Sequence, residues 1–137
     1  MMMTGNRARS LIVAMALGVM ALPGSAAALE YVQGFDALPV MPGLTPSPAG
    51  SLIFDKPDGR ILQAVLIGDV SADATFGYYE PTLRSLGWDA QDPDGPNQNS
   101  RSRQYRRGVE NLQLLYQASQ GTSPAQLILR LNPAPPQ

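Results

Sequence analysis

The sequence predicts an α+β fold, in which one helix packs across a face of an antiparallel sheet of about five strands. Short runs rich in Leu, Ile, Val and Phe alternate with turn residues, as expected for strands that pair with their neighbours. One amphipathic segment lies between two groups of such runs, and 44% of the 137 residues are apolar. The expected order of elements is therefore strand, strand, helix, strand, strand, strand.

The N-terminal residues 1–28 have the three parts of a secretory signal peptide. Two arginines give a basic start, residues 11–22 are apolar, and small residues precede a cleavage site after Ala28 or after Ala27. A membrane anchor is the alternative, but the apolar run is shorter than the about 20 residues that span a hydrocarbon core. The two arginines are not adjacent, so the general secretory route is expected. We therefore expect a periplasmic or secreted protein without a transmembrane segment after cleavage.

Residues 29–50 are expected to form a Pro-rich extended arm. The prolines between positions 39 and 48 exclude a long helix or a central strand in this segment. The apolar residues of the arm are Phe35, Leu38, Val40, Met41 and Leu44. With so many apolar side chains the arm is too hydrophobic for a free linker. It either packs on the domain or is offered to a partner, and we favour packing.

Residues 51–132 are expected to form the folded domain, which begins with a β-hairpin. Strands at 51–54 and 60–70 flank a turn in which Pro57 presets the backbone and Gly59 accepts a positive φ. The second strand has apolar residues on both of its alternating faces, which is typical of a central strand covered on both sides. The arm is the candidate for the second cover.

A helix is expected from about residue 72 to residue 86. Ser71 precedes it as an N-cap, and Gly87 follows it as a C-terminal stop. Its apolar stripe consists of Phe76, Tyr79, Leu83 and Leu86. Trp88 comes directly after the stop, so its large side chain is expected to fold back into the core.

The rest of the chain is expected to hold a polar loop, three strands and a disordered tail. The loop covers residues 89–102, the strands cover 103–107, 112–117 and 125–131, and the tail covers 133–137.

The sequence contains neither cysteine nor histidine. Their absence excludes disulfides and a lipid-modified cysteine, and it removes the commonest general base and zinc ligand. Asp92 and Asp94 suggest a calcium loop, but Pro96 and Asn97 break the spacing that such a loop needs. We therefore expect no metal, no cofactor and no enzyme activity. The alternative is a small hydrolase or lyase that uses carboxylates from its 11 acidic residues.

Arginines at positions 101, 103, 106 and 107 surround Tyr105 and form the main cluster of charge. Alternate residues of a strand share a face, which places Arg101, Arg103, Tyr105 and Arg107 together. One interpretation is an edge strand that its charges keep soluble. The other is a binding surface for an anionic partner, because guanidinium groups bind phosphate and carboxylate in a bidentate manner.

The balance of charge narrows the choice of partner. Removal of residues 1–28 leaves 8 basic and 11 acidic side chains, a formal charge of −3. This acidic balance argues against a nucleic acid. Envelope lipids, cell-wall polymer or an acidic envelope protein are the natural candidates. The expected function is a non-catalytic periplasmic binding or adaptor module of the cell envelope.

Residues 76–88 read FGYYEPTLRSLGW, an aromatic helix that ends in Leu-Gly-Trp. With the polar loop, the Arg- and Tyr-rich strand and the alternating last strand that follow, this segment resembles small uncharacterised exported bacterial proteins. It is also distantly similar to the sheet-and-helix modules of outer-membrane assembly accessory lipoproteins. The resemblance spans about residues 51–132 and implies a sheet-and-helix fold that works in the cell envelope. No site residue is carried over from it.

Overall fold

The computed structural model describes residue 24, residues 28–91 and residues 101–135. Most of the predicted signal peptide lies outside the described residues. The same is true of Asp92 and Asp94 in the polar loop and of the last two residues of the predicted tail.

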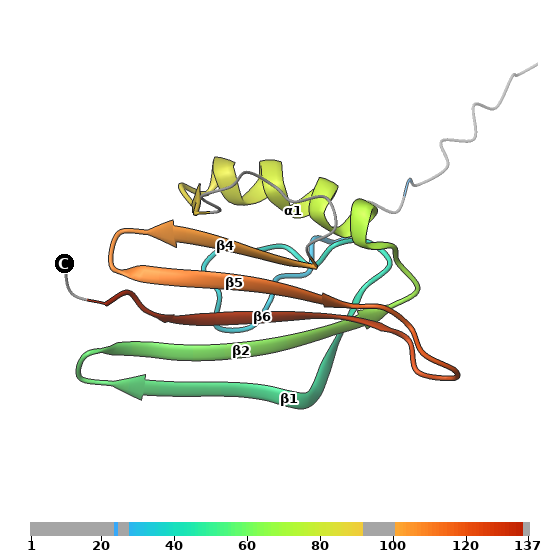
Figure 1. Cartoon of the computed structure of the whole chain (residues 1–137), viewed down its shortest axis with the longest axis horizontal. Helices are drawn as coiled ribbons and strands as arrows, with labels where there is room; N and C mark the ends of the chain where they lie inside the picture. The colour runs from blue at the N-terminus through green and yellow to red at the C-terminus, as the bar shows by residue number, and fades with distance from the viewer. Residues whose placement is uncertain (1–23, 25–27, 92–100, 136–137) are drawn as a thin grey trace, which may run out of the picture.

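The structure confirms the predicted α+β class, with one helix and one antiparallel sheet (Figure 1). The sheet has six strands in the order β1-β2-β6-β5-β4-β3. Figure 1 shows α1 on the β4 side of the sheet, whereas β1 forms the opposite edge. The elements are β1 (Thr45–Lys56), β2 (Gly59–Gly68), α1 (Ala72–Ser85), β3 (Asp89–Ala90), β4 (Ser102–Arg107), β5 (Glu110–Gln117) and β6 (Ala125–Pro133).

The prediction of about five strands missed β3. This strand has only two residues, so it is too short to show the alternation by which a strand is recognised in a sequence. It pairs with β4 through Asp89 opposite Arg106 and Ala90 opposite Tyr105. The arginine-rich strand β4 is therefore flanked on both sides and is not the edge of the sheet.

The first hairpin begins earlier than predicted, because the last six residues of the expected arm belong to β1 (Thr45–Lys56). Pro46 and Pro48 are tolerated there since β1 is an edge strand, which needs hydrogen bonds along one side only. The strand carries a wide irregularity. Ser47 pairs with Val65 and Leu52 pairs with Gln63, so residues 48–51 stand opposite a single residue of β2.

Helix α1 begins and ends where its caps predict. The Ser71 Oγ accepts a hydrogen bond from the Ala74 N–H at 3.1 Å, and Gly87 has a φ of +86°. Tyr79 and Leu83 of the predicted stripe are completely buried. Trp88 is buried as well, and its N–H donates to the Leu83 carbonyl at 2.9 Å. The turn after the helix thus returns the indole to the core.

The arm packs against the domain. Its buried side chains are Val32, Phe35, Leu38, Val40 and Leu44, all of which join the main core. The Tyr79 hydroxyl holds the arm to α1, since it accepts from the Met41 N–H and donates to the Pro39 carbonyl, both at 3.0 Å. The arm also crosses the end of β2 in backbone contact, because a Cβ on Gly68 would lie 2.0 Å from the Gly43 oxygen.

The helix and the arm cover the same face of the sheet. The core-facing strand residues are Leu62, Ala64, Leu66, Tyr105, Leu112, Leu114, Tyr116, Ala125, Leu127, Leu129 and Leu131. In the described part of the chain, the prediction that the second strand is covered on both faces is borne out only at Val65, which is buried and has Gly50 of β1 against it. On this face, opposite the helix and the arm, Val65, Ile128 and Leu115 lie side by side in adjacent strands.

Candidate functional site

The structure places most of the predicted anion-binding residues on the face that α1 covers. Arg103, Tyr105 and Arg107 share one face of β4, as the alternation predicted, but this face is not open. Tyr105 exposes 3% of its surface and is a core residue. A strand pattern shows which residues share a face, but it does not show which face the rest of the chain covers.

Two of these arginines lie over aromatic rings of the core. The Arg103 guanidinium carbon is 4.5 Å from the centroid of the Phe76 ring, and that of Arg107 is 4.5 Å from the centroid of Trp88. Arg107 also donates from Nη1 to the Leu86 carbonyl at 3.3 Å. A planar guanidinium stacked on a ring shields the ring from water and is attracted by its π-electrons. Both side chains therefore help to close the core under α1.

Arg107 also takes part in an ionic network with Asp36 of the arm, Arg60 and Glu110. Arg60 donates from Nε to Glu110 at 2.8 Å and from Nη2 to Asp36 at 2.9 Å. The Arg107 Nη2 lies 3.6 Å from Asp36 and 3.8 Å from Glu110. The hydrogen bond with Glu110 is the main cause that raises the pKa of Arg60 above its usual range. The network fastens the arm to three strands, so we assign it a structural role.

Arg101 lies apart from the other three and lines a cavity. The residue directly precedes β4, and its carbonyl accepts a hydrogen bond from the Tyr116 N–H at 2.8 Å. Its side chain is exposed, and it takes part in none of the ion pairs between described residues. The cavity measures about 500 Å³ and is lined by Arg101, Tyr116, Gln117, Ala118, Gln120, Ser123, Pro124 and Gln126.

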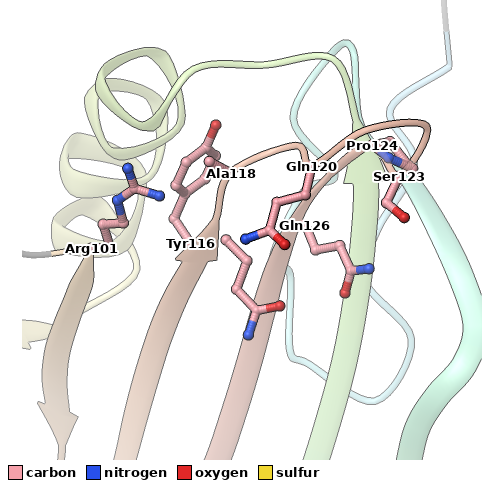
Figure 2. A pocket seen from close by; sticks show the side chains of 8 residues that line it. Arg101, Tyr116, Ala118, Gln120, Ser123, Pro124 and Gln126 are labelled. Carbon is pink, nitrogen blue, oxygen red and sulfur yellow. The ribbon is translucent and has the colours of Figure 1, made fainter.

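The walls of this cavity come from the end of β5, the start of β6 and the segment that connects them. Figure 2 shows Arg101 on one side of Tyr116, with Gln120, Gln126 and Ser123 on the other. The connecting segment is held by two hydrogen bonds between the backbones of Gln120 and Ser123, at 2.9 and 3.1 Å. The Tyr116 hydroxyl donates to the Val70 carbonyl at 2.6 Å, which fixes the ring at the back of the cavity.

The cavity offers hydrogen-bond donors and one positive charge. Arg101 carries a guanidinium with five N–H donors, and the side-chain amides of Gln117, Gln120 and Gln126 each donate and accept. Among the described residues, no carboxylate lines this cavity. Such a set of groups can bind an anion or a ligand rich in oxygen atoms, but it supplies no general base for hydrolysis.

The glutamines and Ser123 were not predicted as site residues. On the sequence they read as the outward side of strands or as loop residues, and nothing local shows that they converge. Arg101 was predicted because it belongs to the charge cluster. The anion-binding role of the cluster stays a prediction. Of its four residues, Arg101 is the one that lines this cavity.

The alternative hydrolase or lyase function would need carboxylates, and the structure places several of them. Asp36 and Glu110 both form ion pairs with Arg60. Asp58 lines a separate, open hollow at the other end of the sheet, and the other residues around it carry no acid. Within residues 28–91 and 101–135, no group of three or more acidic side chains is placed to hold a metal ion.

Comparison with known proteins gives no further guide to the site. No protein-family model matches the chain, and no curated protein matches it. In the part of the chain that the structure describes, no helix has both the length and the apolar character to cross a membrane.

Proposed function

We propose that this protein is a non-catalytic binding or adaptor module of the cell envelope, which holds an anionic group of an envelope component at the Arg101 cavity. The observation that carries the proposal is that Arg101 and three glutamine side chains line one cavity of about 500 Å³. Cavities of this size are typical of small-ligand sites or of the part of a larger ligand that anchors it.

The chemistry of the lining favours a phosphate or carboxylate group. The guanidinium matches such groups in shape and charge, and the neutral amides add hydrogen bonds without a competing negative charge. Because Arg101 is exposed, its attraction is screened by salt over about 8 Å at physiological ionic strength. We therefore expect weak to moderate binding that falls as salt is added.

The envelope setting is supported by the sequence. Residues 1–28 have the pattern of a signal peptide, and residues 51–132 resemble exported modules of the envelope. The sequence lacks histidine and cysteine, and the described residues of the lining include no carboxylate, which favours binding over catalysis.

The test is retention of the purified protein on anionic envelope material at low and at high salt. Vesicles with a phosphate-rich anionic lipid, neutral vesicles and cell-wall fragments would be compared by sedimentation. Arg101→Gln is expected to abolish retention on the anionic material, whereas the unaltered protein is retained at low salt. Arg84→Gln is the matched control, because Arg84 is an exposed arginine of α1 whose partner is Glu80.

Two results would contradict the proposal. One is an unaltered protein that is not retained on either anionic material at low salt. The other is an Arg101→Gln variant that binds as well as the unaltered protein. A loss of retention in both arginine variants would show a general effect of charge and would remove the cavity from the proposal.

A further inference from the structure

The C-terminal half of β1, residues 51–56, forms a hydrophobic edge of the sheet. Leu52, Ile53 and Phe54 are each 52% exposed, and they follow one another in the strand. Within the described residues β1 pairs with β2 alone, so the backbone groups along its outer side have no strand beside them. Soluble proteins usually protect such an edge, because it accepts a further strand.

In this half of β1, side chains on both faces of the sheet are exposed. Leu52 and Phe54 lie opposite Gln63 and Ile61, on the face that neither α1 nor the arm covers. Ile53 lies opposite Leu62 on the covered face, but the cover ends near it and leaves half of its surface exposed. A molecule laid on one face would shelter only some of these side chains. An added strand satisfies the backbone and contacts the side chains of both faces.

We propose that residues 51–56 pair with the same residues of a second copy of this chain, antiparallel and about a two-fold axis. Two sheets that keep the same face up can pair only with residues of the same face opposite each other. With Ile53 on the axis, Leu52 lies opposite Phe54 of the second copy and Ser51 lies opposite Asp55. The pairs then match in polarity on both faces of the joined sheet.

The charges of the segment argue against two neighbouring registers. If Asp55 lay on the axis, its carboxylate would face that of the second copy, which is destabilising. With Phe54 on the axis, Asp55 would face Ile53 and Lys56 would face Leu52. The register about Ile53 keeps the charged residues apart from one another and from the apolar pairs. One acid and one base in the segment also leave no net repulsion between two copies.

The neighbouring backbone limits the ladder to this short segment. The wide irregularity at residues 48–51 ends it on one side, and the turn at Pro57 ends it on the other. Three half-exposed apolar side chains from each copy make a small interface. Interfaces below about 1,200 Å² in total are usually weak or transient. We therefore expect a reversible dimer that forms as the protein concentration is raised.

The experiment is sedimentation velocity over a range of concentrations, with protein purified from expression of the full sequence. The unaltered protein is expected to shift from monomer to dimer. Leu52→Lys and Phe54→Glu, each alone, are expected to keep the protein monomeric, because each places a charge opposite an apolar residue. The double variant Leu52→Lys/Phe54→Glu is expected to restore the dimer, since the register pairs opposite charges across the axis.

Val109→Lys is the matched control. Val109 is 78% exposed in the β4–β5 turn and lies outside the edge, so this variant is expected to dimerise like the unaltered protein. Thermal unfolding of each variant checks that it is folded. A monomeric unaltered protein would overturn the proposal and leave the edge to a strand of another protein. Dimers in both single variants would overturn it as well, and a monomeric double variant would overturn the register.

Discussion

The Arg107 side chain contacts both the core and charged groups at the surface. It stacks on Trp88, donates to the Leu86 carbonyl and lies near the carboxylates of Asp36 and Glu110. These contacts join the end of α1, the arm and β5. An arginine in this position contributes to stability through packing as much as through charge.

We expect Arg107→Gln to lower the free energy of unfolding by about 1–2 kcal/mol, through loss of the stacked guanidinium and its partly exposed ion pairs. Urea unfolding measures the change. Arg106→Gln is the control, since Arg106 lies on the opposite face of β4 and bonds only to the nearby Gly108 carbonyl among the contacts described. Equal losses in the two variants would show that the packing on Trp88 contributes nothing.

Tyr79 links stability to pH. Burial raises the pKa of Tyr79 above its usual range, so folding favours the neutral phenol. This contribution is complete below the pKa of the unfolded chain, about 10, and is lost as the pH rises toward the folded value. Urea unfolding between pH 8 and pH 11, about one unit above that pKa, is expected to show a fall in stability at the alkaline end.

Tyr79→Phe separates the hydroxyl from the ring. The variant is expected to be less stable at pH 8, a pH below the unfolded pKa of about 10, because the Met41 N–H and the Pro39 carbonyl lose their partner. Its further fall with rising pH is expected to be smaller than that of the unaltered protein. Parallel curves for the two proteins would mean that other groups cause the alkaline loss.

At the scale of elements, the sequence predicted the boundaries that depend on residues close together in the chain. Ser71 and Gly87 predicted the helix to within a residue, because caps act within one turn. The start of β1 was missed since Pro46 and Pro48 argue against a strand, and only the position at an edge makes them acceptable. Which face the helix and arm cover depends on contacts far apart in the chain, so alternation alone could not reveal it.

The close crossing of the arm over β2 predicts that substitution of Gly68 lowers stability. Gly68→Ala is expected to displace the arm and to cost more than about 2 kcal/mol, because the added Cβ would overlap the Gly43 carbonyl. Gly77→Ala is the matched control, since a Cβ there meets no atom within 4 Å and alanine favours a helix. Thermal unfolding of the two variants is expected to move in opposite directions. A shared direction would contradict the close crossing.

At the scale of the whole molecule, the sequence predicted the fold class but only part of the candidate site. Arg101 was found because charge can be counted along a chain. Gln117 and Gln126 could not be found, because they meet only where two strand ends and their connection come together. The hydrophobic edge at Leu52–Phe54 was read as an ordinary strand, since nothing in the sequence shows whether another strand follows it in the sheet.

The position of β6 bears on the order in which the molecule can assemble. This strand follows the other five described strands along the chain, yet it lies between β2 and β5 in the sheet. Until residues 125–133 are available, the first hairpin and the β4–β5 hairpin have no strand to join them, and the arm and α1 have only part of a surface to cover. A chain fed vectorially through a narrow channel would therefore stay loose until β6 emerged. For a protein that crosses a membrane as proposed above, this topology delays compaction during transit and makes arrival of the C-terminal strand the event that completes the fold.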